Sequence, residues 1–118
     1  MRTAHAIVWL TLAASTWAHP EIEGALARLN PLIAASPRDA DLFLERGELY
    51  ARHADWVSAE ANFLIAAELA PHHSGVARAR GALALATGDP TAARRHLDAA
   101  LEGQPADAIS LVLRARSH

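Results

Sequence analysis

The residues best suited to chemistry are the adjacent histidines His72 and His73, because imidazole is a common zinc ligand. Adjacent side chains rarely point at one ion, however, and a zinc site usually needs about four ligands, for which only nearby carboxylates remain. His53 and His96 have no acidic partner at a useful spacing. The sequence contains no cysteine, no Gly-rich phosphate loop, no G-x-S-x-G motif and no H-E-x-x-H motif. We therefore expect no metal site, no cofactor and no catalytic residue, and we expect the histidine pair to lie in a solvated loop.

Three arginines are the second candidate for a binding site. Arg46, Arg80 and Arg114 are equally spaced, so in a chain that repeats at this interval they would form a row on equivalent helices. Three guanidinium groups in a row could bind a carboxylate or another anion. The alternative is structural: each stem packs beside the small residue that follows it, and each head group bonds to a neighbouring helix. We favour the structural interpretation because each arginine adjoins the expected packing face.

Composition and charge indicate a folded domain without a basic surface. The 118 residues are 52% hydrophobic and 20% charged, and the formal net charge is −2. These fractions are typical of a globular protein rather than a disordered one. The charge gives no indication of nucleic-acid binding.

Residues 1–18 have the features of a secretory signal peptide. Arg2 is the only charged residue before Glu21, and residues 4–14 are mostly apolar. Ala18 and the residue two positions before it are small, as a signal peptidase requires. The sequence therefore predicts an exported protein, periplasmic or secreted, with no stable membrane anchor after cleavage. The alternative is a first repeat helix, because apolar residues of this segment fall in register with the repeat.

The rest of the chain repeats at the interval that separates the prolines at positions 37, 71 and 105. Other coincidences at the same interval are Gly47 with Gly81, Leu49 with Leu83, Asp55 with Asp89, Ala59 with Ala93, Phe63 with Leu97, and Ala66 with Ala100. A period of this length is typical of stacked helical hairpins. Helix signals predict helices over 21–35 (bent or split near Pro31), 40–53, 56–69, 74–86, 90–102 and 107–116.

Gly47 lies in the middle of a predicted helix, where glycine costs about 1 kcal/mol relative to alanine. We expect that the missing side chain lets this helix press against Ala59 of the next helix. Tyr50 and Phe63 would then interlock around the contact. Close packing of the two backbones would offset the cost of the glycine.

The order Gly47, Tyr50, Ala59, Phe63, Ala66, Pro71 resembles the tetratricopeptide repeat (TPR), whose pattern is G-x-x-Y, then A-x-x-x-F, then P. The resemblance, to a small exported bacterial member of this family, implies an all-α fold: a short α-solenoid of antiparallel helix pairs in a TPR-like superhelix. It divides the chain into a signal peptide (1–18), a partial repeat with the second helix only (19–37), two TPR-like repeats (38–71 and 72–105) and a C-terminal capping helix (106–118). The expected repeat core is Gly47, Tyr50, Ala59, Phe63, Ala66, Gly81, Ala93, Leu97 and Ala100.

Members of the TPR family commonly bind extended peptides on their concave face. The resemblance therefore implies a non-catalytic module for a protein or peptide partner. Here the concave face would carry Asp41, Leu44, Glu48, Arg52, Arg78, Leu85, Ile109 and Val112. Some members clamp a C-terminal carboxylate with Lys and Asn, but this sequence contains no Lys. The alternative is a small assembly subunit that self-associates through its terminal helices.

We expect cleavage after Ala18 in a host that exports the protein, which would leave a chain beginning at His19. The intact mass of the recovered protein measures this directly. A mature species that still begins at Met1 would contradict export and would favour the repeat-helix alternative for residues 4–18.

Overall fold

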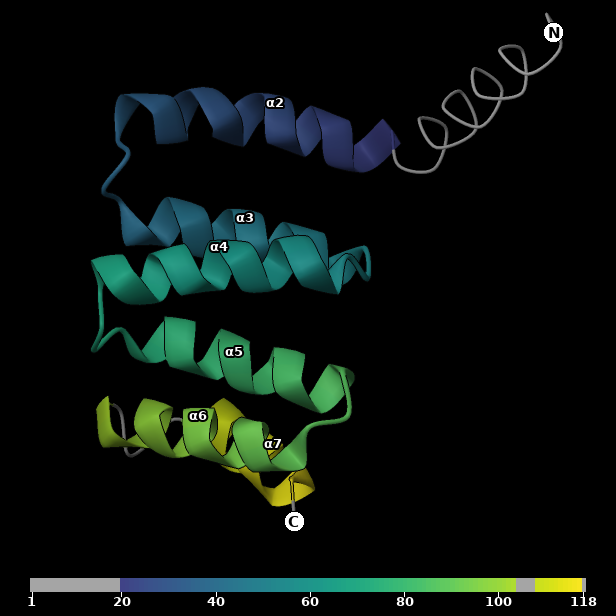
Figure 1. Cartoon of the computed structure of the whole chain (residues 1–118), viewed down its shortest axis with the longest axis vertical. Helices are drawn as coiled ribbons and strands as arrows, with labels where there is room; N and C mark the ends of the chain where they lie inside the picture. Colours follow the sequence, from purple (N-terminus) through teal and green to yellow (C-terminus); the bar gives the residue numbers. More distant parts are fainter. Residues whose placement is uncertain (1–19, 104–107, 118) are drawn as a thin grey trace, which may run out of the picture.

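The computed structural model describes residues 20–103 and 108–117, and within these ranges the chain forms six α-helices and no strands. The helices are α2 (Pro20–Ala35), α3 (Ala40–Arg52), α4 (Trp56–Leu69), α5 (Ser74–Ala86), α6 (Pro90–Gly103) and α7 (Ala108–Arg116). They follow one another down an antiparallel stack (Figure 1). The predicted all-α class is confirmed. The predicted signal peptide lies outside the described residues.

Two hairpins, α3 with α4 and α5 with α6, make the closest helix contacts. α2 packs on α3, α4 packs on α5, and α7 packs on α5 and α6. Each helix therefore rests on its chain neighbours, as in a solenoid. No helix of the described ranges combines the length and the apolar character needed to span a membrane.

Two glycines set the helix separation inside the hairpins. A Cβ atom on Gly47 would lie 2.5 Å from Phe63 Cε1 and 3.2 Å from the Ala59 carbonyl oxygen. A Cβ atom on Gly81 would lie 2.6 Å from both Cγ and Cδ2 of Leu97. Both distances to side-chain carbon are shorter than real contacts allow. The large side chain of the second helix therefore occupies the space that each glycine leaves open.

The core follows these contacts from one hairpin to the next. Among the residues of the expected repeat core, Tyr50 is half-buried and the rest are buried: Gly47, Ala59, Phe63, Ala66, Gly81, Ala93, Leu97 and Ala100. Phe63 is 1% exposed and contacts a cluster that includes Leu83 of the next repeat. Ile22 and Leu29 of α2 form a separate cluster with Leu49 of α3. Each helix therefore buries one of its faces against a neighbouring helix of the stack.

The turns inside the two hairpins share one geometry. Asp55 caps α4 by accepting a hydrogen bond from Ser58 N (3.1 Å), and Asp89 accepts one from Ala92 N (3.0 Å). The residue before each aspartate has positive φ: Ala54 at 58° and Gly88 at 79°. Glycine suits this conformation and alanine is strained in it.

The ends of α3 and α5 are also equivalent. The His53 ring Nδ1 donates to the Leu49 carbonyl (2.9 Å), and Thr87 Oγ1 donates to the Leu83 carbonyl (3.0 Å). Both side chains therefore donate to a carbonyl in the last turn of their helix.

α2 runs without interruption although Pro31 lies inside it, so of the two alternatives at this proline, a bend or a split, the structure excludes the split. Proline cannot donate to the carbonyl four residues earlier, which belongs to Ala27. Ala27 and Pro31 are both exposed, so water can satisfy this carbonyl and the helix can continue.

Gly47→Leu and Phe63→Ala should each destabilise the protein strongly. The leucine would overpack the helix crossing, at about 1–3 kcal/mol or more. The alanine would empty a core site, at about 3–5 kcal/mol. Arg52→Ala is the control, because Arg52 is exposed and should shift the free energy of unfolding by less than about 0.5 kcal/mol. Urea midpoints measure all three, and an equal loss for Arg52→Ala would show that the helix faces are wrongly assigned.

Candidate functional site

A groove of about 480 Å³ lies between α3 and α5, with contributions from α4 and α7. α3 supplies Glu48, Ala51 and Arg52. α5 supplies Arg78 at one end and three alanines, at positions 79, 82 and 86. We call this feature the α3–α5 groove. Its volume falls in the range of about 300–1,000 Å³ that is usual for binding pockets.

Most of the residues that line the groove are apolar. Phe63 and Leu83, which also belong to the core, line it from below, and Leu113 of α7 lines it from the next repeat. Trp56, the first residue of α4, lies at the groove and is 38% exposed. An aromatic side chain that is half in solvent supplies a large contact surface for a partner.

The structure brings together three of the residues predicted to bind a partner. Glu48, Arg52 and Arg78 all line the α3–α5 groove. Leu44 is half-buried instead, and it packs against core residues that include Phe43. Leu85 is half-buried and does not line the groove.

The predicted residues on the last helix are only partly described. The side chain of Ile109 lies outside the described part of the chain. Val112 is 57% exposed and does not line the groove, whereas its neighbour Leu113 does. The sequence therefore pointed to the last helix, but it did not identify Leu113 as the residue of that helix that lines the groove.

Sequence reasoning also did not predict that the groove is hollow on its α5 side. The repeat alignment contains a signal for it, because Ala82 and Ala86 stand one repeat later in the places of Glu48 and Arg52. Shortening both side chains on one face of a helix opens space above it. Trp56 could have been noticed as a large aromatic residue directly after the helix cap Asp55.

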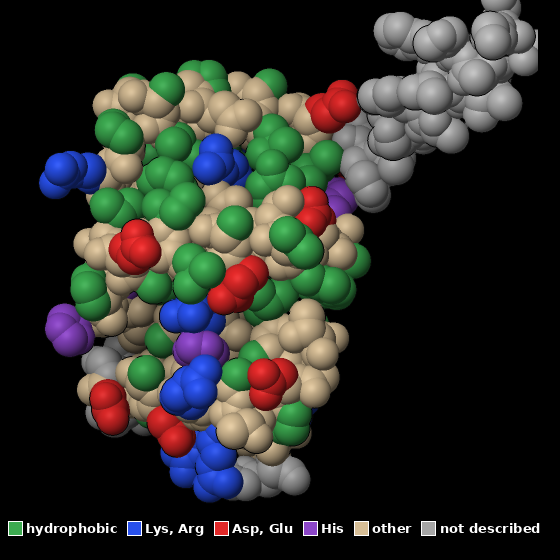
Figure 2. Space-filling model, viewed as in Figure 1, with side chains coloured by type: hydrophobic (Ala, Val, Ile, Leu, Met, Phe, Trp, Pro, Cys, Tyr) green, Lys and Arg blue, Asp and Glu red, His purple; other side chains and the backbone are tan. Residues whose placement is uncertain are grey.

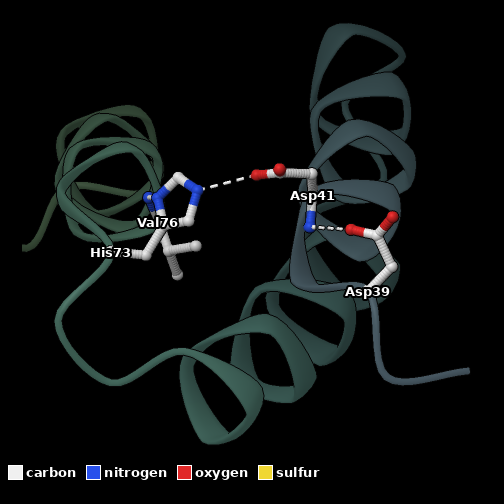
Figure 3. A network of polar contacts seen from close by, with 4 residues as sticks. All are labelled: Asp39, Asp41, His73 and Val76. Atoms are coloured by element: carbon white, nitrogen blue, oxygen red, sulfur yellow. Dashed lines mark hydrogen bonds and ion pairs between the residues drawn. The ribbon is translucent and has the colours of Figure 1, made fainter.

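Asp41 takes part in a polar network at the start of α3 and α5 (Figure 3). The His73 ring nitrogen Nε2 lies 2.7 Å from Asp41 Oδ1, and Nδ1 accepts a hydrogen bond from Val76 N at 3.3 Å. Because Nδ1 accepts, the ring proton is on Nε2, which donates to Asp41. The network therefore links two successive repeats, and both ring nitrogens of His73 take part in it.

His73 lies in the loop before α5, as expected, but its side chain caps that helix and pairs with Asp41 and so is not only solvated. The equivalent position one repeat earlier is Asp39, which caps α3. Gly75 leaves room for the His73 ring, because a Cβ atom on Gly75 would lie 2.8 Å from His73 Cε1. A histidine in the place of the usual short polar cap explains why sequence reasoning overlooked it. His72 is exposed.

The three arginines of the row each contact a polar side chain of a neighbouring helix, Arg46 by hydrogen bonds and the other two by ion pairs. Arg46 Nε donates to Asn62 Oδ1 (2.7 Å), and its Nη1 donates to Asn30 Oδ1 (3.0 Å). Arg80 Nη2 lies 3.6 Å from Glu60 Oε1, and Arg114 Nε lies 3.6 Å from Asp98 Oδ1. These contacts favour the structural interpretation of the row.

Arg80 differs from Arg46 in the hydrogen bonding of its Nε atom. Its Nε is buried and has no hydrogen-bond partner. The residue equivalent to Asn62 is His96, which supplies no such bond here. Burial lowers the pKa of His96 below 6.5, and the charges of Arg80 and Arg95 lower it further, against a smaller opposing effect of Asp89. The ring is therefore neutral near pH 7.

Groups of three or more His, Asp or Glu side chains able to hold a metal ion do not occur in the described ranges.

The helix arrangement is shared with solved structures, of which 33 chains match. One is the first TPR of Spaghetti (RPAP3) bound to the HSP90 peptide SRMEEVD, with a TM-score of 0.77 and 19% sequence identity. The alignment covers 95% of this chain and 89% of that one. The protein therefore has the TPR fold, a helical solenoid, as the sequence predicted. No protein-family model matches the chain, and no curated protein matches it.

His96→Asn should stabilise the protein and reduce its sensitivity to acid. Asn62 shows the expected geometry, in which its amide donates to the Ser58 carbonyl (2.8 Å) while Oδ1 accepts from arginine. The same pair at Arg80 should add about 1 kcal/mol. Because folding lowers the pKa of His96, its contribution to stability is complete above 6.5 and is lost as the pH falls toward the lowered value.

Urea unfolding at about pH 7.5 and at about pH 5.5 measures both effects. The wild type should lose more stability between these values than His96→Asn loses. His72→Asn is the matched control, because it makes the same substitution at an exposed position away from Arg80. Equal acid sensitivity in the wild type and His96→Asn would contradict the assignment of a neutral His96 beside Arg80.

Proposed function

We propose that the protein is a non-catalytic interaction module that binds a peptide or protein partner in the α3–α5 groove. The observation that carries the proposal is the groove itself, in which apolar walls lie beside the exposed or half-buried charges of Glu48, Arg52 and Arg78. Apolar surface supplies the free energy of association, and a few charges fix the orientation of the partner. The peptide-bound TPR structure of similar fold supports this choice.

A second candidate is self-association through exposed apolar side chains. On α7, Leu111 and Val112 are 47% and 57% exposed, and on α4, Val57 is 83% exposed. Figure 2 shows hydrophobic side chains gathered over α2 to α4 on the face in view, while charged and histidine side chains gather over α5 and α6. Such apolar area is a candidate surface for a second copy.

We also propose that the protein works outside the cytoplasm, after removal of residues 1–18. The support is the sequence pattern alone: one arginine, an uncharged apolar segment and small residues before the cleavage position. The absence of cysteine from the sequence is compatible with an exported protein that needs no disulfide.

Selection from a phage-displayed library of random peptides tests the groove. Peptides selected on the folded protein should bind at least about tenfold more weakly to Arg52→Glu/Arg78→Glu, measured by fluorescence anisotropy. The control Arg38→Glu/Arg94→Glu makes the same change in net charge at exposed positions outside the groove and should bind like the wild type.

Two results would contradict the proposal. Peptides that bind both double variants equally well would place the site elsewhere. If light scattering shows a dimer that Val112→Ser converts to a monomer, and no selected peptide depends on the groove, the self-associating subunit is the better description.

A further inference from the structure

The two end helices of the stack each correspond to one half of a hairpin. α2 stands in the place of a second helix, because its Leu29 lies one repeat before Phe63 of α4. α7 stands in the place of a first helix, because its Ala115 lies one repeat after Gly81 of α5. Among the described helices, α2 contacts α3 alone, and α7 contacts α5 and α6. Within the described ranges, neither end helix therefore has the hairpin partner that its position requires.

Both end helices expose a leucine on the face where a hairpin partner would pack. In the first complete hairpin, Phe43 of α3 and Ala66 of α4 are buried in one core cluster. The equivalent residues at the two ends are Leu111 of α7 and Leu32 of α2, which are 47% and 45% exposed. Packing Leu111 of one copy against Leu32 of another would repeat the contact that the complete hairpin makes and would remove apolar surface from water.

The charges at the two end helices are complementary. The first turn of α2 carries Glu21 and Glu23, and the last turn of α7 carries Arg114 and Arg116. In an antiparallel hairpin the end of the first helix lies beside the start of the second helix. A hairpin made of α7 and α2 would therefore place the basic end of α7 beside the acidic start of α2, which favours this pairing over α7 with α7 or α2 with α2.

From these faces we infer that copies of the protein stack head to tail, with α7 of one copy forming a hairpin with α2 of the next. The two faces lie at opposite ends of the stack (Figure 1), so the contact is heterologous and leaves one face open at each end of the assembly. The stacking names the contact for the self-association considered above and does not depend on what the α3–α5 groove binds. It rests on the proposed removal of residues 1–18, because this segment directly precedes α2 and is the competing occupant of its face.

Two features should make the end contact weaker than a hairpin within one chain. Ala115 has a methyl group where Gly81 has none, so α7 and α2 would lie farther apart than the helices of the complete hairpins. Arg28 of α2 would lie near Arg114 of α7, although each already pairs with a carboxylate of its own chain. We therefore expect reversible association at micromolar concentration.

Variants that block one end each test the stacking. Leu32→Asp places a charge on the α2 face, and Leu111→Asp places one on the α7 face. Both leucines are exposed, so the fold should tolerate the changes, and circular dichroism verifies this. Leu64→Asp is the matched control, because Leu64 is 44% exposed on α4, which lies inside the stack. Analytical ultracentrifugation of the chain recovered from the exporting host, at about 5–200 μM, measures the association, and intact mass fixes where that chain begins.

The wild type and Leu64→Asp should associate, with an average mass that keeps rising with concentration past that of a dimer. Leu32→Asp and Leu111→Asp should each associate at least about tenfold more weakly when alone. An equimolar mixture of these two variants should form a dimer and no larger species. In the mixture, one intact α7 face meets one intact α2 face, and both remaining faces are blocked.

Other patterns of association would overturn the stacking. If only one of the two end variants loses association, that end pairs with itself. Association that survives both variants places the contact elsewhere on the protein. A wild type that begins at His19 and stays monomeric over the whole range overturns the stacking and leaves the proposed export standing. A monomer that retains residues 1–18 overturns both.

Discussion

The contact of a large side chain with the backbone of a glycine determines how closely the paired helices approach. Phe63 rests over Gly47, and Leu97 rests over Gly81 one repeat later. The free energy gained by close packing offsets the unfavourable helix propensity of glycine. Phe63 also lines the α3–α5 groove, so the residue that fixes the hairpin contributes to the lining of the groove as well.

Polar contacts then fix one repeat relative to the next. His73 joins the start of α5 to Asp41 on α3, and Arg80 reaches from α5 to Glu60 on α4. Arg46 reaches both neighbours of its own helix. Apolar packing is tolerant of small slips, whereas hydrogen bonds are directional. The hydrogen bonds of His73 and Arg46 therefore supply the orientation that apolar packing alone would leave loose.

The sequence predicted most of the fold and less of the site. Period, prolines and caps located the helices, because these signals act through the local backbone and recur from one repeat to the next. Helix periodicity also placed Glu48, Arg52 and Arg78 on one face. It could not show that Leu44 packs against the core, that Trp56 borders the groove, or that His73 reaches Asp41. Those outcomes depend on how neighbouring helices cross, which no single helix encodes.

The equivalence of the hairpin turns has a consequence for how the chain can be altered. Ala54 and Gly88 occupy the same left-handed backbone position, and the side chains of His53 and Thr87 donate to equivalent carbonyls. The two repeats thus use different residues at equivalent positions to form the same turn. Residues at equivalent positions could therefore be exchanged between the two repeats. Such exchanges would distinguish residues that the shared fold requires from residues that suit only the contacts of one repeat.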